Sequence, residues 1–265
     1  MAITKPRIDG LTIAGLALLL MPLLTMLHEI GGHAAMCAAV GRVQQIGAFY
    51  VECDTQTLLS KRLVSLAGPG IDAVLAVIGY GLWRNLKGDL ARLVTWYVWL
   101  SCGFVASGYL LFSGVSGLGD LGPSGDGGLA PLAPPLVWRA AFVLVGFASY
   151  FMLVKAGMAT LSAMIGQGPD TKQARRRIAH FYYAVLCIAA VVASLPNPVG
   201  LLITLTSAVA ASFGGHAGLI SIGYATHDGG EARAFTIGRN FPLLIAGGIA
   251  TIAFAAILGP TLTFP

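Results

Sequence analysis

An apolar run of helical length near the start of the chain contains three ionisable residues. From Leu11 to Leu27 its only polar side chains are two threonines, and the run continues through His28, Glu29 and His33 into further apolar residues. Ionisable side chains at membrane depth are energetically costly, and they usually mark functional sites. Any fold of this chain must therefore bring partners to a polar cluster that lies in a hydrophobic environment.

The composition is typical of a membrane protein. Of the 265 residues, 56% are hydrophobic and only 10% are charged, whereas soluble domains carry about a quarter charged residues. The four cysteines do not have the spacing of a disulfide framework, and three of them lie in apolar runs. The net charge of +5 is expected to reflect orientation in the bilayer rather than nucleic-acid binding.

The hydrophobic pattern predicts an all-α polytopic membrane protein with six or seven transmembrane helices. A helix that crosses a bilayer needs about 20 apolar residues. The segment 43–59 is too polar to cross and contains β-prone residues, so it is expected to form a small β-hairpin or a re-entrant segment after the first helix. The candidate helices are 11–39, 63–83, 91–114, 136–157, 180–195, 199–222 and 240–259.

Lysine and arginine residues in the loops predict the orientation of these helices. With seven helices, eleven basic residues fall on one side and only three, Arg42, Lys61 and Arg62, fall on the other. The strongly basic side is expected to be cytoplasmic, together with the N-terminus. The His28 motif then lies toward the non-cytoplasmic side, and the loop 115–133, which has no lysine or arginine, emerges on that same side.

The order His28-Glu29-Ile30-Gly31-Gly32-His33 is close to His-Glu-x-x-His, in which two imidazoles bind zinc and the glutamate is the general base. Five positions separate the two histidines, which on a regular α-helix at about 100° per residue turns them about 140° apart. A π-bulge would realign the rings, and Gly31-Gly32 is where that distortion crowds fewest side chains. The alternative is that the histidines bond to neighbouring helices, but three ionisable groups so close together favour a metal.

A catalytic zinc ion usually has three protein ligands and an open fourth position. The glycine-rich loop after the third predicted helix supplies two carboxylate candidates, Asp120 and Asp126. Asp72, in the second predicted helix, is another candidate ligand or a partner that orients a ligating histidine. Its alternative role is that of a protonated carboxyl group in helix packing.

With these motifs the chain resembles the site-2 protease family of intramembrane zinc proteases. That family pairs a His-Glu-x-x-His helix with a later Asp-Gly motif whose aspartate is the third ligand, and Gly125-Asp126-Gly127-Gly128 is similar to that motif. Ala67-Gly68-Pro69-Gly70-Ile71-Asp72 is similar to another family segment, which commonly ends in asparagine. The first motif is one residue longer than in the family, although dipeptidyl peptidase III has a similar His-Glu-x-x-Gly-His zinc motif. The resemblance covers about residues 28–130.

The resemblance implies a set of site residues. His28, His33 and Asp126 would bind Zn²⁺, with Asp120 as the alternative third ligand, and Glu29 would act as general base on a zinc-bound water. The implied activity is that of a zinc metalloendopeptidase that hydrolyses a peptide bond in or near the membrane.

The resemblance also divides the chain into two segments. Residues 1–133, with about three transmembrane helices, would form the metalloprotease core, and residues 134–265 would supply further helices of unassigned role. The substrate would be a membrane protein or a peptide.

Two other classes of function use the same residues. One is a membrane zinc hydrolase that acts on a lipid or another amide. The other is a non-proteolytic metal-binding protein, either a transporter or an inactive relative. His216 follows two glycines, as His33 does, but it is expected near the cytoplasmic end of its helix and therefore away from His28.

Overall fold

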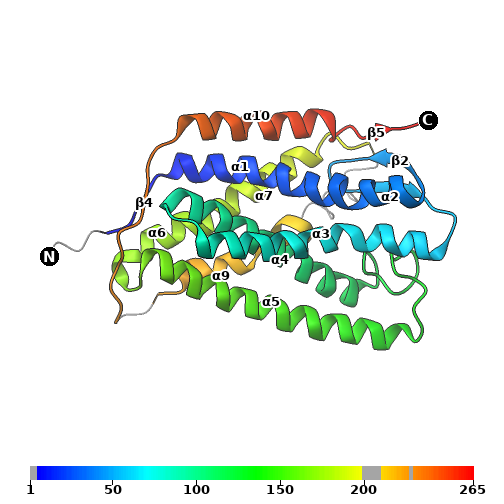
Figure 1. Cartoon of the computed structure of the whole chain (residues 1–265), viewed down its shortest axis with the longest axis horizontal. Coiled ribbons are helices and arrows are strands. Elements are labelled where there is room, and N and C mark those ends of the chain that lie inside the picture. The colour runs from blue at the N-terminus through cyan, green and yellow to red at the C-terminus, as the bar shows by residue number, and fades with distance from the viewer. Residues whose placement is uncertain (1–4, 199–209, 227–228) are drawn as a thin grey trace.

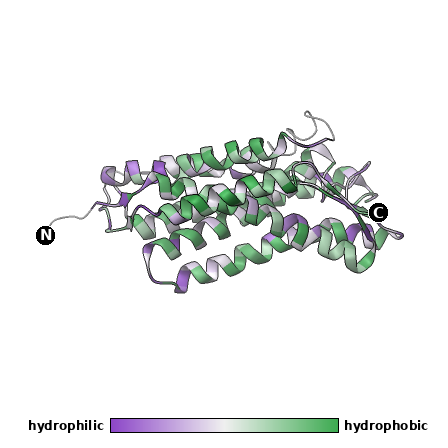
Figure 2. Ribbon diagram, turned by 90° about the horizontal axis from the view of Figure 1, so that it is seen from above, coloured by the Kyte–Doolittle hydropathy of each residue, from purple (hydrophilic) through white to green (hydrophobic). Residues whose placement is uncertain are grey.

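The computed structural model is a bundle of long helices that run roughly along one axis, with small sheets at its two ends (Figure 1). The structure describes residues 5–198, 210–226 and 229–265. Within them, five helical segments are long and apolar enough to cross a membrane. Hydrophilic residues gather at both ends of the bundle and hydrophobic residues fill the length between them (Figure 2). This distribution is the one expected of an integral membrane protein.

The helical elements follow one another in a simple order. The first long segment consists of α1 (Gly10–Met26), η1 (Leu27–Ala34) and α2 (Ala35–Val40). The next three are α3 (Leu58–Asn85), α4 (Asp89–Ser116) and α5 (Pro135–Ile165). The fifth consists of η2 (Pro169–Thr171), α6 (Lys172–Arg176), η3 (Arg177–Phe181) and α7 (Tyr182–Ser194). The remaining helices are η4 (Ala210–Gly214), α9 (Gly218–Tyr224) and α10 (Phe241–Ile257).

Five of the seven helices expected from the sequence are confirmed as long apolar helices. The expected helix 240–259 corresponds to α10, which is apolar but only 17 residues long. The expected helix 199–222 lies in part outside the described residues, and its described part contains two short elements, η4 and α9.

The first and last apolar helices, α1 and α10, lie side by side (Figure 1). Two glycines permit the contact: a Cβ atom at Gly15 would collide with the backbone of Leu244, and one at Gly247 would collide with the carbonyl of Gly15. Thr251 adds a hydrogen bond of 2.6 Å from its Oγ1 to the carbonyl oxygen of Leu18. Close backbone approach at small residues is the usual way in which helices associate in lipid. The helix that carries the His28 motif is therefore fixed by an element from the far end of the sequence.

The expected β-hairpin is confirmed. Strands β2 (Arg42–Ile46) and β3 (Val51–Asp54) pair antiparallel directly after the first helical segment. A third strand, β5 (Leu262–Thr263), pairs antiparallel with the other edge of β2, so the strand order is β3-β2-β5. At the opposite end of the bundle, β1 (Arg7–Ile8) pairs parallel with β4 (Thr236–Ile237).

The cysteines differ from the sequence-based expectation. Cys37 in α2 and Cys53 in β3 form a disulfide bond, whereas Cys102 and Cys187 are buried free thiols. The pairing was missed because Cys37 lies in an apolar run and its partner arrives only when the hairpin folds back onto α2. Stable disulfides form in oxidising compartments, so the bond agrees with the predicted non-cytoplasmic location of this end of the bundle.

We predict that only two of the four cysteines react with a thiol reagent when the protein is unfolded without a reductant. The reactive pair should be Cys102 and Cys187, and reduction should add Cys37 and Cys53. Mass spectrometry of alkylated peptides measures this directly, with the Cys37→Ser variant expected to release Cys53. Labelling of all four thiols before reduction, in protein taken from membranes, would contradict the bond.

Candidate metal centre

The eight residues of η1 form a π-helical turn within the first long segment. This is the distortion expected from the spacing of the two histidines, because the wider turn brings residues five positions apart onto one face. His28 Nε2 and His33 Nε2 lie 3.2 Å apart, and both side chains are buried. The two rings therefore converge on one point, as two ligands of one ion must.

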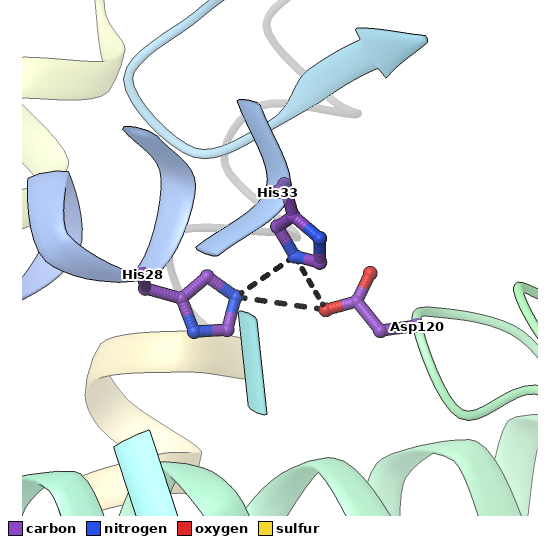
Figure 3. A group of neighbouring side chains, drawn as sticks. All are labelled: His28, His33 and Asp120. Atoms are coloured by element: carbon purple, nitrogen blue, oxygen red, sulfur yellow. Dashed lines mark hydrogen bonds and ion pairs between the residues drawn. The ribbon is translucent and has the colours of Figure 1, made fainter. Parts of the chain in front are cut away.

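Asp120 lies at the same point, and it comes from the loop between α4 and α5 (Figure 3). Its Oδ2 is 3.2 Å from His33 Nε2 and 3.6 Å from His28 Nε2. Ligand atoms that surround a zinc ion tetrahedrally at about 2.0–2.1 Å lie about 3.3 Å from one another. The three separations thus match one face of a tetrahedral site, and the fourth corner is left for another ligand.

Asp126, favoured by the family resemblance, lies elsewhere. It is exposed and does not belong to the His28, His33 and Asp120 group. The glycines that follow it shape the loop instead: a Cβ atom at Gly128 would collide with the carbonyl oxygen of Asp120 and with Ser65. The segment that resembles an Asp-Gly ligand motif therefore positions the alternative aspartate, Asp120.

A side chain from α3 also fixes this loop. Arg62 donates hydrogen bonds to the carbonyl oxygens of Leu129, at 3.1 Å, and Pro131, at 2.7 Å. Within the loop, the amide of Gly128 donates to the carbonyl oxygen of Gly119 at 2.9 Å, next to Asp120. These bonds fix the position of the Asp120 carboxylate, although the loop that carries it has no regular secondary structure.

The outer nitrogens of both rings have partners that set their tautomers. His33 Nδ1 is 2.7 Å from the carbonyl oxygen of Val64, which can only accept, so Nδ1 carries the proton. His28 Nδ1 is 2.6 Å from Asp72 Oδ2, the carboxylate–histidine pairing that orients metal ligands. In the neutral rings both Nε2 atoms then present lone pairs to each other and to a carboxylate oxygen. A shared proton removes the repulsion at only one of the three contacts between these atoms. A divalent cation between them removes the repulsion at all three.

Two glycines allow η1 and α3 to meet at the site. A Cβ atom at Gly32 would collide with the backbone of Ala67 and Gly68, and one at Gly68 would collide with Nε2 of both histidines. The α3 backbone therefore forms one wall of the metal centre. Gly70, two residues further along the same helix, has open space around its Cα atom.

Asp120 lies outside the long helices, and its pKa is perturbed in two opposing directions. Burial raises the pKa, but hydrogen bonds from His28 and His33, formed when an Nε2 atom carries a proton, outweigh burial and lower it to about 2. The carboxylate is therefore ionised at any pH at which the protein would work, as a metal ligand must be.

An apolar cavity of about 590 Å³ opens beside the centre, and His28, Glu29, Asp72 and Asp120 all contribute to its lining. Glu29 is 4% exposed, and its Oε2 has no hydrogen-bond partner among the described residues. A buried carboxylate oxygen without a partner costs free energy, and a catalytic role is one of the reasons for which such a group is retained. The remaining wall is mainly apolar and includes Met21, Leu24, Val105, Phe112 and Leu186.

Two residues at this cavity were not assigned to the site from the sequence. The ring of Tyr109 stacks on that of His28 with centroids 5.1 Å apart, and nothing in the sequence around Tyr109 signals this contact. His216, expected on the opposite side of the membrane, is buried and lines the same cavity. The expectation was wrong because it assumed one continuous helix, whereas the described part of that segment is the π turn η4 followed by a short helix.

No protein-family model, curated protein or solved structure matches the chain. The chemistry must therefore be argued from the centre itself.

We predict that Asp120→Asn removes bound zinc and that Asp126→Asn does not. The first change deletes a ligand, so the affinity should fall by more than the 10- to 100-fold typical of an outer partner. The second alters an exposed side chain of the same loop and serves as the matched control. Zinc per chain, measured by elemental analysis of the purified proteins, distinguishes them, and equal loss in both variants would point to collapse of the loop.

Gly68→Ala should also abolish zinc binding, because its methyl group would occupy the space of the two Nε2 atoms. Gly70→Ala should leave zinc content unchanged and stabilise α3 by about 0.5–1 kcal/mol, since alanine is the better helix former. Zinc analysis and thermal unfolding of both variants test this pair. Normal zinc content in Gly68→Ala would mean that α3 does not lie against the centre.

Proposed function

We propose that the chain is a membrane-embedded zinc metalloprotease that hydrolyses a peptide bond in or near the bilayer. The observation that carries the proposal is the convergence of His28, His33 and Asp120 beside a cavity that Glu29 also lines. Two imidazoles, a carboxylate and an open fourth position form a ligand set typical of catalytic zinc. A structural zinc site would instead be closed by a fourth protein ligand.

A zinc ion held there would activate a water molecule, by lowering its pKa to about 7, and would polarise the carbonyl under attack. Glu29 follows His28 in the π turn and reaches the same cavity, so we assign to it the removal of the water proton. It then delivers that proton to the leaving amine. Asp72 holds the His28 ring in the tautomer that would present Nε2 to a bound ion.

The lining and the volume of the cavity favour a substrate that is apolar and extended. Its lining is dominated by aliphatic and aromatic side chains from α1, α4 and α7, and its volume of about 590 Å³ lies within the usual range for bound ligands. A short stretch of a membrane protein, unwound so that its carbonyl groups are accessible, has this character. The resemblance to the site-2 protease family supports the same substrate class.

The proposal includes an orientation. The N-terminus is placed in the cytoplasm and the metal centre toward the opposite side of the membrane. The excess of basic residues in the loops that include Arg7, Arg84 and Arg176 supports this arrangement. The Cys37–Cys53 disulfide lies at the same end of the bundle as the metal centre, and it supports the non-cytoplasmic placement of that end as well.

We predict that Glu29→Gln abolishes peptide hydrolysis while zinc stays bound. The change removes the general base but none of the three ligands, so the rate should fall by about 10² to 10⁴-fold. The protein is reconstituted in vesicles with an apolar model transmembrane peptide, and products are identified by mass spectrometry. Glu52→Gln, at an exposed position of β3, is the matched control and should cleave as the parent protein does.

Three results would contradict the proposal. Undiminished cleavage by Glu29→Gln would show that another group is the base. Cleavage of an N-acyl lipid in place of the peptide would assign the centre to a lipid amidase. Bound zinc with neither activity, in a protein that transports the ion across vesicles, would favour a transporter.

A further inference from the structure

A second cavity, of about 680 Å³, opens at the end of the bundle where α1 begins. It lies about 27 Å along the first helical segment from His28, at about 1.5 Å rise per residue. Three arginines, one aspartate and one histidine contribute to its lining. The three arginines outnumber the single aspartate, so the cavity carries a net positive charge.

Two of the three guanidinium groups come from consecutive residues of the fifth helical segment, and the third comes from the residues just before α10. Arg176 ends α6, Arg177 begins η3, and Arg239 precedes α10. The neighbouring Arg175 is not part of this surface, because it is fully buried and donates to Ser162 Oγ and the carbonyl oxygen of Gly166. The run of arginines thus has two roles, with Arg175 inside the bundle and the next two at the cavity.

Each cavity arginine is held by a contact that leaves most of its donors available. Arg177 Nη1 donates to the carbonyl oxygen of Ile8 at 2.6 Å, and Arg239 Nε donates to Asp9 Oδ2 at 3.3 Å. The Arg176 guanidinium lies 5.6 Å from the centroid of the Tyr224 ring. A guanidinium has five N–H donors, and one that is already oriented loses less entropy when it binds a phosphate.

Apolar side chains border the same cavity. Leu11 on α1 and Phe181 at the end of η3 line it, and they are 42% and 41% exposed. Leu11 is the second residue of α1, and Phe181 directly precedes α7, so both lie where an apolar helix begins. A free anion needs the cationic groups alone, whereas a ligand that also covers these side chains must carry hydrocarbon.

We propose that this cavity binds an anionic phospholipid, with the headgroup phosphate on Arg176, Arg177 and Arg239 and the acyl chains over Leu11 and Phe181. Basic pockets between membrane helices are suited to anionic headgroups. Arginine is also the side chain best matched to phosphate oxygens. The site is separate from the metal centre, so it stands whether or not the chain is a protease.

The test is a lipid titration followed by native mass spectrometry of the delipidated protein in detergent. Dioleoylphosphatidylglycerol should bind roughly tenfold or more tightly than dioleoylphosphatidylcholine. Arg176→Gln/Arg239→Gln should lose this preference, and Arg176→Lys/Arg239→Lys should retain most of it. Arg84→Gln, an exposed arginine outside the cavity, is the matched control and should bind as the parent protein does.

A second measurement separates a lipid from a free anion and guards against misfolding. Inorganic phosphate at millimolar concentration should not displace phosphatidylglycerol. Arg176→Gln alone, which gives up only the contact with Tyr224, should weaken phosphatidylglycerol binding several-fold if the double variant does not fold. Equal affinity for the two lipids, an unchanged preference in the glutamine variants, or full displacement by phosphate would each overturn the proposal.

Discussion

The contact between η1 and α3 at Gly32 and Gly68 is the constraint on which the rest of the metal centre depends. It lets one helical backbone lie directly against two imidazole rings, and it places the carbonyl of Val64 and the carboxylate of Asp72 at their outer nitrogens. With those nitrogens occupied, both Nε2 atoms must turn toward each other and toward Asp120. The electrostatic conflict at that point is a direct product of backbone packing, and a cation resolves it.

The sequence was sufficient to predict how the two histidines are brought together. The five-residue spacing of the histidines required a local distortion, and the paired glycines marked its place, so the π turn was predictable from helix geometry. The hairpin after the first helix and the long apolar helices were predictable from polarity. These features depend on neighbouring residues, and local physical rules apply to them.

The choice of the third ligand was not available from the sequence. Asp120 and Asp126 lie in one glycine-rich loop, and their positions are decided by contacts of Gly128 with Ser65 and of Arg62 with loop carbonyls. Such contacts join residues far apart in the chain and have no periodic signature. The disulfide was missed for the same reason, and His216 was misplaced because depth was counted along a helix that is interrupted.

The packing of α1 against α10 has a consequence for how the protein is made. In this chain α1, which leads into the histidine-bearing η1, is synthesised before α10, and most of the other helices are made between them. Until α10 arrives, the glycine face of α1 has only lipid or insertion factors beside it. The cavity wall that includes His216 and Leu186 also comes from late segments. We therefore expect a nascent chain to hold its histidines in an unfinished cleft, and the cavity wall to be completed only after the segments that carry Leu186 and His216 have been made.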